Sequence, residues 1–131
     1  MTRPLKDFFT IKFKARGRDW NGCDCWGFAR LVAVEHFGKE VPALDENYSR
    51  IENSEELEGL VSKHKALFQE CLNQPGALVL LRRSGFDCHV GIMVSDHEFL
   101  HIEKGIGVNK QSINHSHWSD KLLGFYEYRA G

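Results

Sequence analysis

The hydrophobic pattern changes its period partway along the chain, and this change constrains the fold more than any other feature. Over residues 24–37, DCWGFARLVAVEHF, apolar residues recur at helical spacing and cover most of the helix circumference. From residue 77 onward they alternate in short runs separated by turn residues. Helices followed by consecutive strands are typical of an α+β domain. A chain of 131 residues is the length of one domain, so we expect a single domain over 1–131.

The boundaries of the expected elements follow from capping and turn residues. Asp24 is a suitable N-cap for the first helix, and Gly38 a suitable stop. A second helix is expected over about 54–72, ahead of the NQPG turn. Short turns separate the expected strands, and connections this short join antiparallel neighbours. We therefore expect N-terminal helices packed on an antiparallel sheet of five to six strands, with strands at 77–82, 88–94, 98–104, 107–113 and 124–129.

Bulk properties narrow the classes of function. The formal net charge of −1 argues against a dedicated nucleic-acid binder. No apolar stretch approaches the roughly 18 residues of a membrane span, so we expect no membrane insertion. The start, MTRPLKDFFTIKFKARG, lacks the apolar core of a secretion signal, which predicts synthesis in the cytoplasm and reduced thiols. We expect neither a cofactor nor a metal.

Three residues are candidates for one catalytic site. Cys25 lies at the first turn of the expected helix, and His89 and His101 lie on neighbouring expected strands. Strand alternation and a hairpin through SDHE bring the two histidines to one face. If the helix packs its N-terminus over that face, Cys25 meets His89 and His101 lies behind it. These are the parts of a nucleophile, base and orienting residue.

Each of these residues has a defined chemical role in that reading. A helix N-terminus and a neighbouring imidazolium both favour the thiolate of Cys25. His89 would hold the ion pair and protonate the leaving amine, while His101 would fix its ring orientation. The backbone N–H of Cys25 is a candidate oxyanion donor. Asp24 would start the helix, and the glycines of GCDCWGF would let substrate approach the backbone.

Other readings of the same residues stay open. A zinc site of Cys23, Cys25, Cys88 and His89 is disfavoured, because C-x-C is tighter than the usual ligand spacing and Cys88 and His89 point to opposite strand faces. A disulfide from Cys23 to Cys25 or Cys88 would regulate the nucleophile.

The tryptophans allow two readings each. Trp26 lines a groove or belongs to the core, and neither reading is favoured. Trp118 lies in NHSHWSD, a polar segment that reads as a surface loop or substrate rim, with His115 and His117 as weak metal candidates.

The ordered segments DCWGFARLV, PGALVLL, HVGIMV and FLHIEK resemble the NlpC-type cell-wall cysteine peptidases, which have a circularly permuted papain-like fold. The resemblance covers nearly the whole chain. The lead-in GRDWNGCDCWGF and the VPAL segment look most like the branch encoded in phage and prophage tail modules.

This resemblance implies a function and a site. Cys25 would be the nucleophile, His89 the base and His101 the third polar residue. The family cleaves amide bonds in peptidoglycan stem peptides, commonly between D-glutamate and the diamino acid. The tail branch would deliver this activity to the cell wall during genome injection, with tail-tip or hub proteins as partners and the virion tail as location.

Two departures from the family pattern affect the expected site. Many members carry a tyrosine upstream of the cysteine, whereas the nearest upstream aromatics here are Phe13 and Trp20. Backbone donors or the indole N–H of Trp20 would then serve the oxyanion. Ala77 also stands where an acidic residue is frequent. The alternative functions are a tail-tip assembly subunit that retains the fold without the activity, and thiol-dependent acyl transfer.

Overall fold

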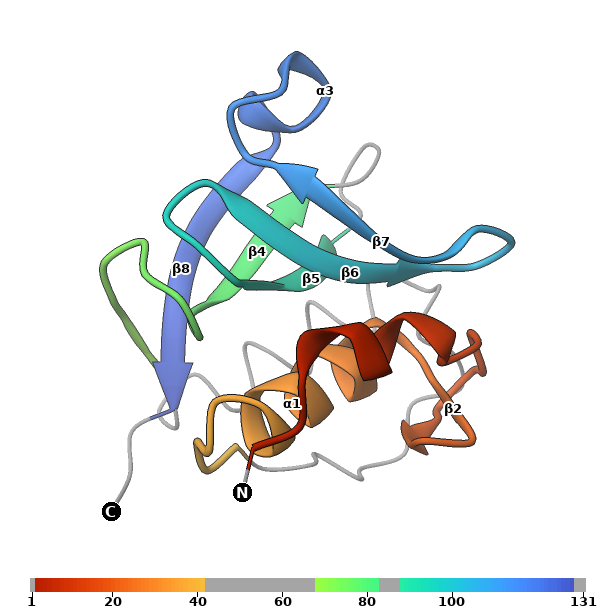
Figure 1. The fold of residues 1–131 in the computed structure, drawn as a ribbon. Helices are drawn as coiled ribbons and strands as arrows, with labels where there is room; N and C mark the ends of the chain where they lie inside the picture. The colour runs from red at the N-terminus through yellow and green to blue at the C-terminus, as the bar shows by residue number, and fades with distance from the viewer. Residues whose placement is uncertain (1, 42–67, 83–87, 129–131) are drawn as a thin grey trace.

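A computed structural model describes residues 2–41, 68–82 and 88–128 (Figure 1). Near the N-terminus lie a 3₁₀ helix, η1 (Leu5–Thr10), a two-stranded hairpin of β1 (Arg18–Asp19) and β2 (Gly22–Cys23), and the helix α1 (Cys25–Glu35). The remaining elements are β3 (Phe68–Glu70), β4 (Leu78–Arg82), β5 (Cys88–Met93), β6 (Glu98–Glu103), β7 (Gly107–Ser112), the short helix α3 (Ser116–Ser119) and β8 (Leu122–Tyr128).

Six strands form one sheet in the order β3-β8-β4-β5-β6-β7, and every neighbouring pair is antiparallel. The α+β class and the antiparallel sheet are thus confirmed. Strands β4 to β7 follow one another as expected from their short connections. The last strand, β8, does not extend this series beyond β7. It returns to the other side of β4, where Leu78 lies opposite Tyr126, and β3 pairs with its outer edge.

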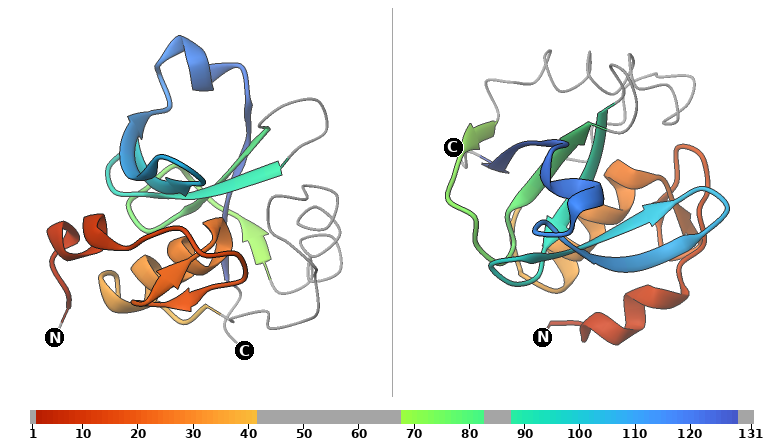
Figure 2. Two further views of the ribbon diagram at one scale, coloured as in Figure 1. Left: turned by 90° about the vertical axis from the view of Figure 1, so that its right-hand side faces the viewer. Right: turned by 90° about the horizontal axis from the view of Figure 1, so that it is seen from above.

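The two faces of the sheet have separate apolar clusters. Helix α1 lies across one face, below the sheet in Figure 1 and beneath β4 and β5 in the right-hand view of Figure 2, and it contacts β5 and β6. The sheet residues that join α1 in this cluster include Val90, Ile92, Leu100 and Ile102. The opposite face has a smaller cluster of Ala77, Val79, Leu81, Met93, Phe99 and Trp118.

The first helix begins where it was predicted to begin, after the N-cap Asp24, and it ends at Glu35, slightly before the expected end at residue 37. A carboxylate oxygen of Asp24 accepts a hydrogen bond from the Gly27 N–H at 2.7 Å, as an N-cap should. Nη1 of Arg18 lies 2.8 Å from both oxygens of the same carboxylate. Gly38 adopts φ +66° beyond the end of the helix, a conformation that favours glycine.

The prediction of a second helix over about 54–72 is wrong at its C-terminal end. Residues 68–70 form strand β3, in which Phe68 pairs with Tyr128 of β8. The remainder of the 54–72 segment up to residue 67 lies outside the described residues. The three residues of β3 have no intrinsic preference strong enough to exclude a strand, and the edge of β8 supplies the hydrogen-bonding partners that make them one.

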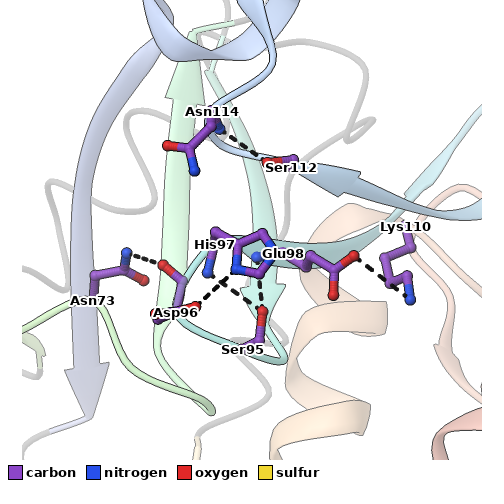
Figure 3. Close-up of polar contacts among 8 residues, drawn as sticks. All are labelled: Asn73, Ser95, Asp96, His97, Glu98, Lys110, Ser112 and Asn114. Atoms are coloured by element: carbon purple, nitrogen blue, oxygen red, sulfur yellow. Dashed lines mark hydrogen bonds and ion pairs between the residues drawn. The ribbon is translucent and has the colours of Figure 1, made fainter.

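Hydrogen bonds and an ion pair stabilise the turn that joins β5 to β6 (Figure 3). The Ser95 hydroxyl accepts hydrogen bonds from the N–H groups of His97 and Glu98, at 3.3 and 3.0 Å. Asn73 donates to the Asp96 carbonyl, and the Asp96 carboxylate lies 2.7 Å from Nδ1 of His97. Because a hairpin turn sets the pairing of its strands, these contacts help to fix which residues of β5 and β6 lie side by side.

In the described part of the chain, no helix has both the length and the apolar character needed to cross a membrane.

Candidate active site

The two predicted histidines form a buried, hydrogen-bonded pair. Nε2 of His89 on β5 lies 2.8 Å from Nδ1 of His101 on β6, and the rings meet at 72°. Only 1% of His89 and none of His101 is exposed. A buried imidazole needs a hydrogen-bond partner for each of its polar atoms, so this contact is a strong constraint on both rings. The expectation that the hairpin brings the histidines together is confirmed.

Gly91 helps to make room for this pair. A Cβ atom at Gly91 would lie 2.9 Å from Cδ2 of Phe99 and 3.0 Å from the Leu100 carbonyl oxygen. Phe99 in turn contacts the ring of His101, with centroids 5.0 Å apart. The glycine in HVGI therefore allows β6 side chains to lie close over β5.

A tryptophan that was expected at the surface instead packs under the histidines. Trp118 is 4% exposed, stacks on His89 at 23° with centroids 6.4 Å apart, and meets His101 edge-on at 5.2 Å. The reading of Trp118 as part of a surface loop or substrate rim is wrong, because α3 folds this one residue inward against the sheet. Its neighbours His115 and His117 are exposed, as expected for a loop.

The body of α1 and the histidines occupy opposite faces of the sheet. Side chains alternate along a strand, so His89 and His101 share the face of Met93 and Phe99, whereas Val90 and Ile92 face the helix. The body of α1 therefore covers the face opposite the histidines, and the expected contact concerns its N-terminal turn alone.

Two observations bear on the position of that turn. Gly76, just before β4, lies against Lys39 and Phe37, so the C-terminus of α1 is near that end of the sheet. The helix has 11 residues, about 16 Å, and therefore begins toward the opposite end, where β5 starts. In addition, β5 and β6 pair at Met93↔Phe99 and Ile92↔Leu100, and among the described residues this pairing stops short of His89.

Cys25 is the first residue of α1 and retains 5% exposure within the cluster that surrounds the helix. This is the position at which the positive end of a helix favours a thiolate. The meeting of its sulfur with His89 and the oxyanion role of its N–H stay predictions.

Trp26 and Trp20, which were expected at the groove and at the oxyanion, both make packing contacts. Trp26 is 3% exposed and meets Phe68 edge-on with centroids 5.7 Å apart, which favours the core reading. The Trp20 ring lies 4.8 Å from that of Phe8, with the Arg3 guanidinium 4.5 Å above it. Trp20 thus helps to hold the N-terminal segment, and an oxyanion role for its indole stays a prediction.

Asp24 is engaged as a cap and is fully buried, so the structure favours its capping role over contact with substrate. Burial raises the pKa of Asp24, and the adjacent Arg18 and the Gly27 N–H oppose this rise.

The glycines around Cys25 serve close packing, which corrects the expectation that they admit substrate. A Cβ at Gly27 would lie 2.0 Å from the Gly17 carbonyl oxygen, and one at Gly17 would lie 2.2 Å from that of Gly22. Gly22 itself has φ +155°, and its Cβ would be 2.6 Å from Cβ of Lys14. The segment before α1 is therefore pressed against the first turn of the helix.

Cys23 is chemically distinct from Cys25. Its sulfur donates to the Asp19 carbonyl at 3.1 Å, and burial, with Asp24 and Asp19 nearby, raises the pKa of the Cys23 thiol to about 12. Neither Cys23 nor Cys25 takes part in a disulfide, which leaves the proposed bond between them without support. Within the described ranges, no three histidine, cysteine or acidic residues are grouped as metal ligands would be.

We expect Cys23 to resist alkylation well above neutral pH. With a pKa of about 12, its thiolate fraction rises tenfold per pH unit but stays small at pH 9. The raised pKa also means that the stability this thiol contributes is fully present below about pH 8.5, the unfolded value, and is lost as the pH rises toward 12. Iodoacetamide labelling of the Cys25→Ala variant, read by peptide mass spectrometry, checks this. Rapid labelling of Cys23 at pH 8 in folded protein would contradict it.

Family and structural relatives agree with this architecture. The chain belongs to the NlpC/P60 family, whose model matches residues 11–127. It is 28% identical over 115 residues to the Escherichia coli K12 protein named murein DD-endopeptidase MepS/murein LD-carboxypeptidase, covering 88% of this chain and 54% of that protein. It is 26% identical over 111 residues to a probable endopeptidase NlpC homolog of Haemophilus influenzae, covering 82% of this chain and 50% of the relative. The chain thus spans about half the length of these relatives.

Two solved structures share the fold. An NLP/P60 family protein described as similar to lipoprotein, from Staphylococcus aureus, superposes with a TM-score of 0.61 over 97% of this chain and 39% of its own. The NlpC/p60 domain of the peptidoglycan hydrolase SagA gives a TM-score of 0.52 over 93% of this chain and 89% of its own. Both are 19% identical to this chain, so the likeness concerns the fold.

The sequence did not indicate three further polar residues around the histidines. Nε2 of His101 lies 2.8 Å from Oδ1 of Asn109 and 3.3 Å from Oε1 of Glu103, and Gln111 contacts the same Asn109 oxygen. Strand alternation places Asn109 and Gln111 on one face of β7. Asn109 lies directly opposite His101, so this alternation could have predicted that Asn109 and Gln111 lie beside the histidines.

Proposed function

We propose that this chain is a cysteine endopeptidase that hydrolyses amide bonds in peptidoglycan stem peptides. The observation that supports it most directly is the buried His89–His101 hydrogen bond in a chain of the NlpC/P60 family. A histidine whose ring is held by a second polar residue is what a thiol nucleophile needs as its base. The names of the relatives, which include a murein endopeptidase, support the substrate class.

The proposed reaction follows from the roles of the three residues. The Cys25 thiolate attacks the amide carbon, and N–H groups at the start of α1 stabilise the resulting oxyanion. Protonated His89 gives its proton to the leaving amine, the C–N bond breaks and a thioester forms. Water then attacks the thioester while His89 accepts one of its protons, and cleavage of the C–S bond releases the carboxylic acid and restores the Cys25 thiolate beside protonated His89. His101 holds the ring of His89 throughout.

The finer assignments belong to this proposal as well. The bond would join D-glutamate to the diamino acid, and the protein would act from a phage or prophage tail during genome delivery, with tail-tip or hub proteins as partners. The choice of bond rests on the resemblance to the NlpC-type peptidases, and the tail location rests on the segments GRDWNGCDCWGF and VPAL. Western blotting of purified phage particles tests the location, since a protein that is absent from the particles would not travel with the tail.

Digestion of purified peptidoglycan tests the activity. Wild-type protein should release stem-peptide fragments whose masses and new amino termini identify the cleaved bond, whereas Cys25→Ala should release none above background. Intact folding of the variant is checked by circular dichroism. Equal release by the two proteins would eliminate a Cys25-dependent hydrolase. Release by neither would favour the assembly subunit that keeps the fold alone.

A further inference from the structure

A chain of polar side chains continues beyond the two histidines and ends at Trp118. The indole Nε1 lies 3.3 Å from Oε1 of Gln111, and Nε2 of Gln111 lies 2.8 Å from Oδ1 of Asn109. The same Oδ1 is 2.8 Å from Nε2 of His101, whose Nδ1 meets Nε2 of His89. Four hydrogen bonds thus connect Trp118 to the expected catalytic base.

The indole sets the direction of this chain. An indole N–H can only donate, so the Gln111 atom facing it must be the carbonyl oxygen. The amide nitrogen of Gln111 then faces Asn109 and donates, which makes the Asn109 atom an oxygen that accepts. That oxygen can accept from His101 only if Nε2 of His101 carries a proton.

Glu103 independently fixes the orientation of Asn109. Nδ2 of Asn109 lies 3.3 Å from Oε1 of Glu103 and 3.3 Å from the Gly107 carbonyl oxygen, both of which accept. A flipped Asn109 would place its carbonyl against both acceptors and its amide against the donating Gln111. The contact with Gln111 and the contacts with Glu103 and Gly107 therefore independently require the same orientation of the Asn109 side-chain amide.

We propose that Trp118, Gln111 and Asn109 form a positioning relay that fixes the protonation pattern of both histidines. With its Nε2 protonated, neutral His101 presents the lone pair of Nδ1 to His89, so Nε2 of His89 carries a proton and donates. Nδ1 of His89 is then the atom that exchanges a proton with Cys25. Only this last step rests on the proposed function, and none of the three relay residues touches the reacting atoms.

The competing arrangement is defined by Glu103. Its Oε1 lies 3.3 Å from Nε2 of His101, and a carboxylate there would also suit a doubly protonated His101. In that state Nδ1 of His101 would donate to His89, and the direction of the chain would be reversed at the pair. The two arrangements differ in whether Nδ1 of His101 carries a proton.

Nitrogen-15 NMR of the histidine rings distinguishes the two protonation arrangements of His101. In the Cys25→Ala variant at neutral pH, we expect His101 to show a protonated Nε2 and an unprotonated Nδ1, and His89 to show a protonated Nε2. A His101→Asn spectrum assigns the signals. A protonated Nδ1 on His101 would overturn the proposal. This readout needs no turnover, so it stands even if the protein hydrolyses no peptidoglycan, which would contradict the proposed function alone.

Substitution in the relay gives a second test. Asn109→Leu removes the acceptor at similar size, and we expect a mixture of His101 tautomers and a fall in kcat of about 10- to 100-fold, as for other residues that orient a catalytic group. KM should stay within about twofold because the relay does not contact substrate. Lys110→Leu, the adjacent exposed position on β7, is the matched control and should change neither value. Unchanged tautomers and kcat in Asn109→Leu would contradict the relay.

Discussion

Replacing His89 with alanine is expected to lower kcat/KM for stem-peptide hydrolysis by about 10⁴-fold, the usual cost of losing one member of a nucleophile–base set. The nucleophile loses the imidazolium that stabilises its thiolate, and the leaving amine loses its proton donor. Because nucleophile and base act as a unit, the Cys25→Ala/His89→Ala double variant should be no slower than Cys25→Ala alone. Rates of amide cleavage on a soluble stem peptide, with the three variants side by side, measure this.

His97→Ala is the matched control for this experiment. His97 lies on the same hairpin, in the exposed turn between β5 and β6, and contacts Asp96 (Figure 3). Its loss should leave the rate within about twofold, as for a surface substitution away from the site. If the losses from Cys25→Ala and His89→Ala were fully additive in the double variant, the two residues would not act together, and the proposed site would be wrong.

Gly27→Ala should destabilise the fold by more than about 3 kcal/mol, because overpacking against backbone cannot be relieved by a rotamer change. The new Cβ would lie 2.0 Å from the Gly17 carbonyl oxygen. In a solvent-exposed helix the same substitution would stabilise by about 1 kcal/mol, so any large loss reports the contact with Gly17. Urea unfolding, followed by circular dichroism, measures the change in the free energy of unfolding.

Gly105→Ala separates this steric effect from a backbone effect. Gly105 adopts φ +83°, but a Cβ there would meet nothing within 4 Å. Its replacement should cost about 1 to 2 kcal/mol, the strain of a left-handed backbone alone. If Gly27→Ala were no more damaging than Gly105→Ala, the segment before α1 would have room to move away from the helix, and the close packing described here would not constrain Cys25.

Local features of the sequence were sufficient to predict the elements that carry the site. Asp24 caps α1 because a short carboxylate can accept from the third helical N–H, and this requires no distant contact. The alternation in CHVGIM and EFLHIE, with a short turn between them, is enough to put His89 and His101 on one face. Segment 68–70 could not be assigned this way, since β8 supplies its partners from more than 50 residues away.

What only the tertiary structure decided is where those elements lie relative to one another. The sequence determined that a cysteine opens a helix and that two histidines share a strand face. It did not determine that the body of α1 covers the other face, that Trp118 turns inward, or that Asn109 and Gln111 complete a hydrogen-bonded chain behind the histidines. The physical reason is that strand and helix periods fix which side chains share a face. The choice of the element that covers each face depends on packing between segments distant in the chain.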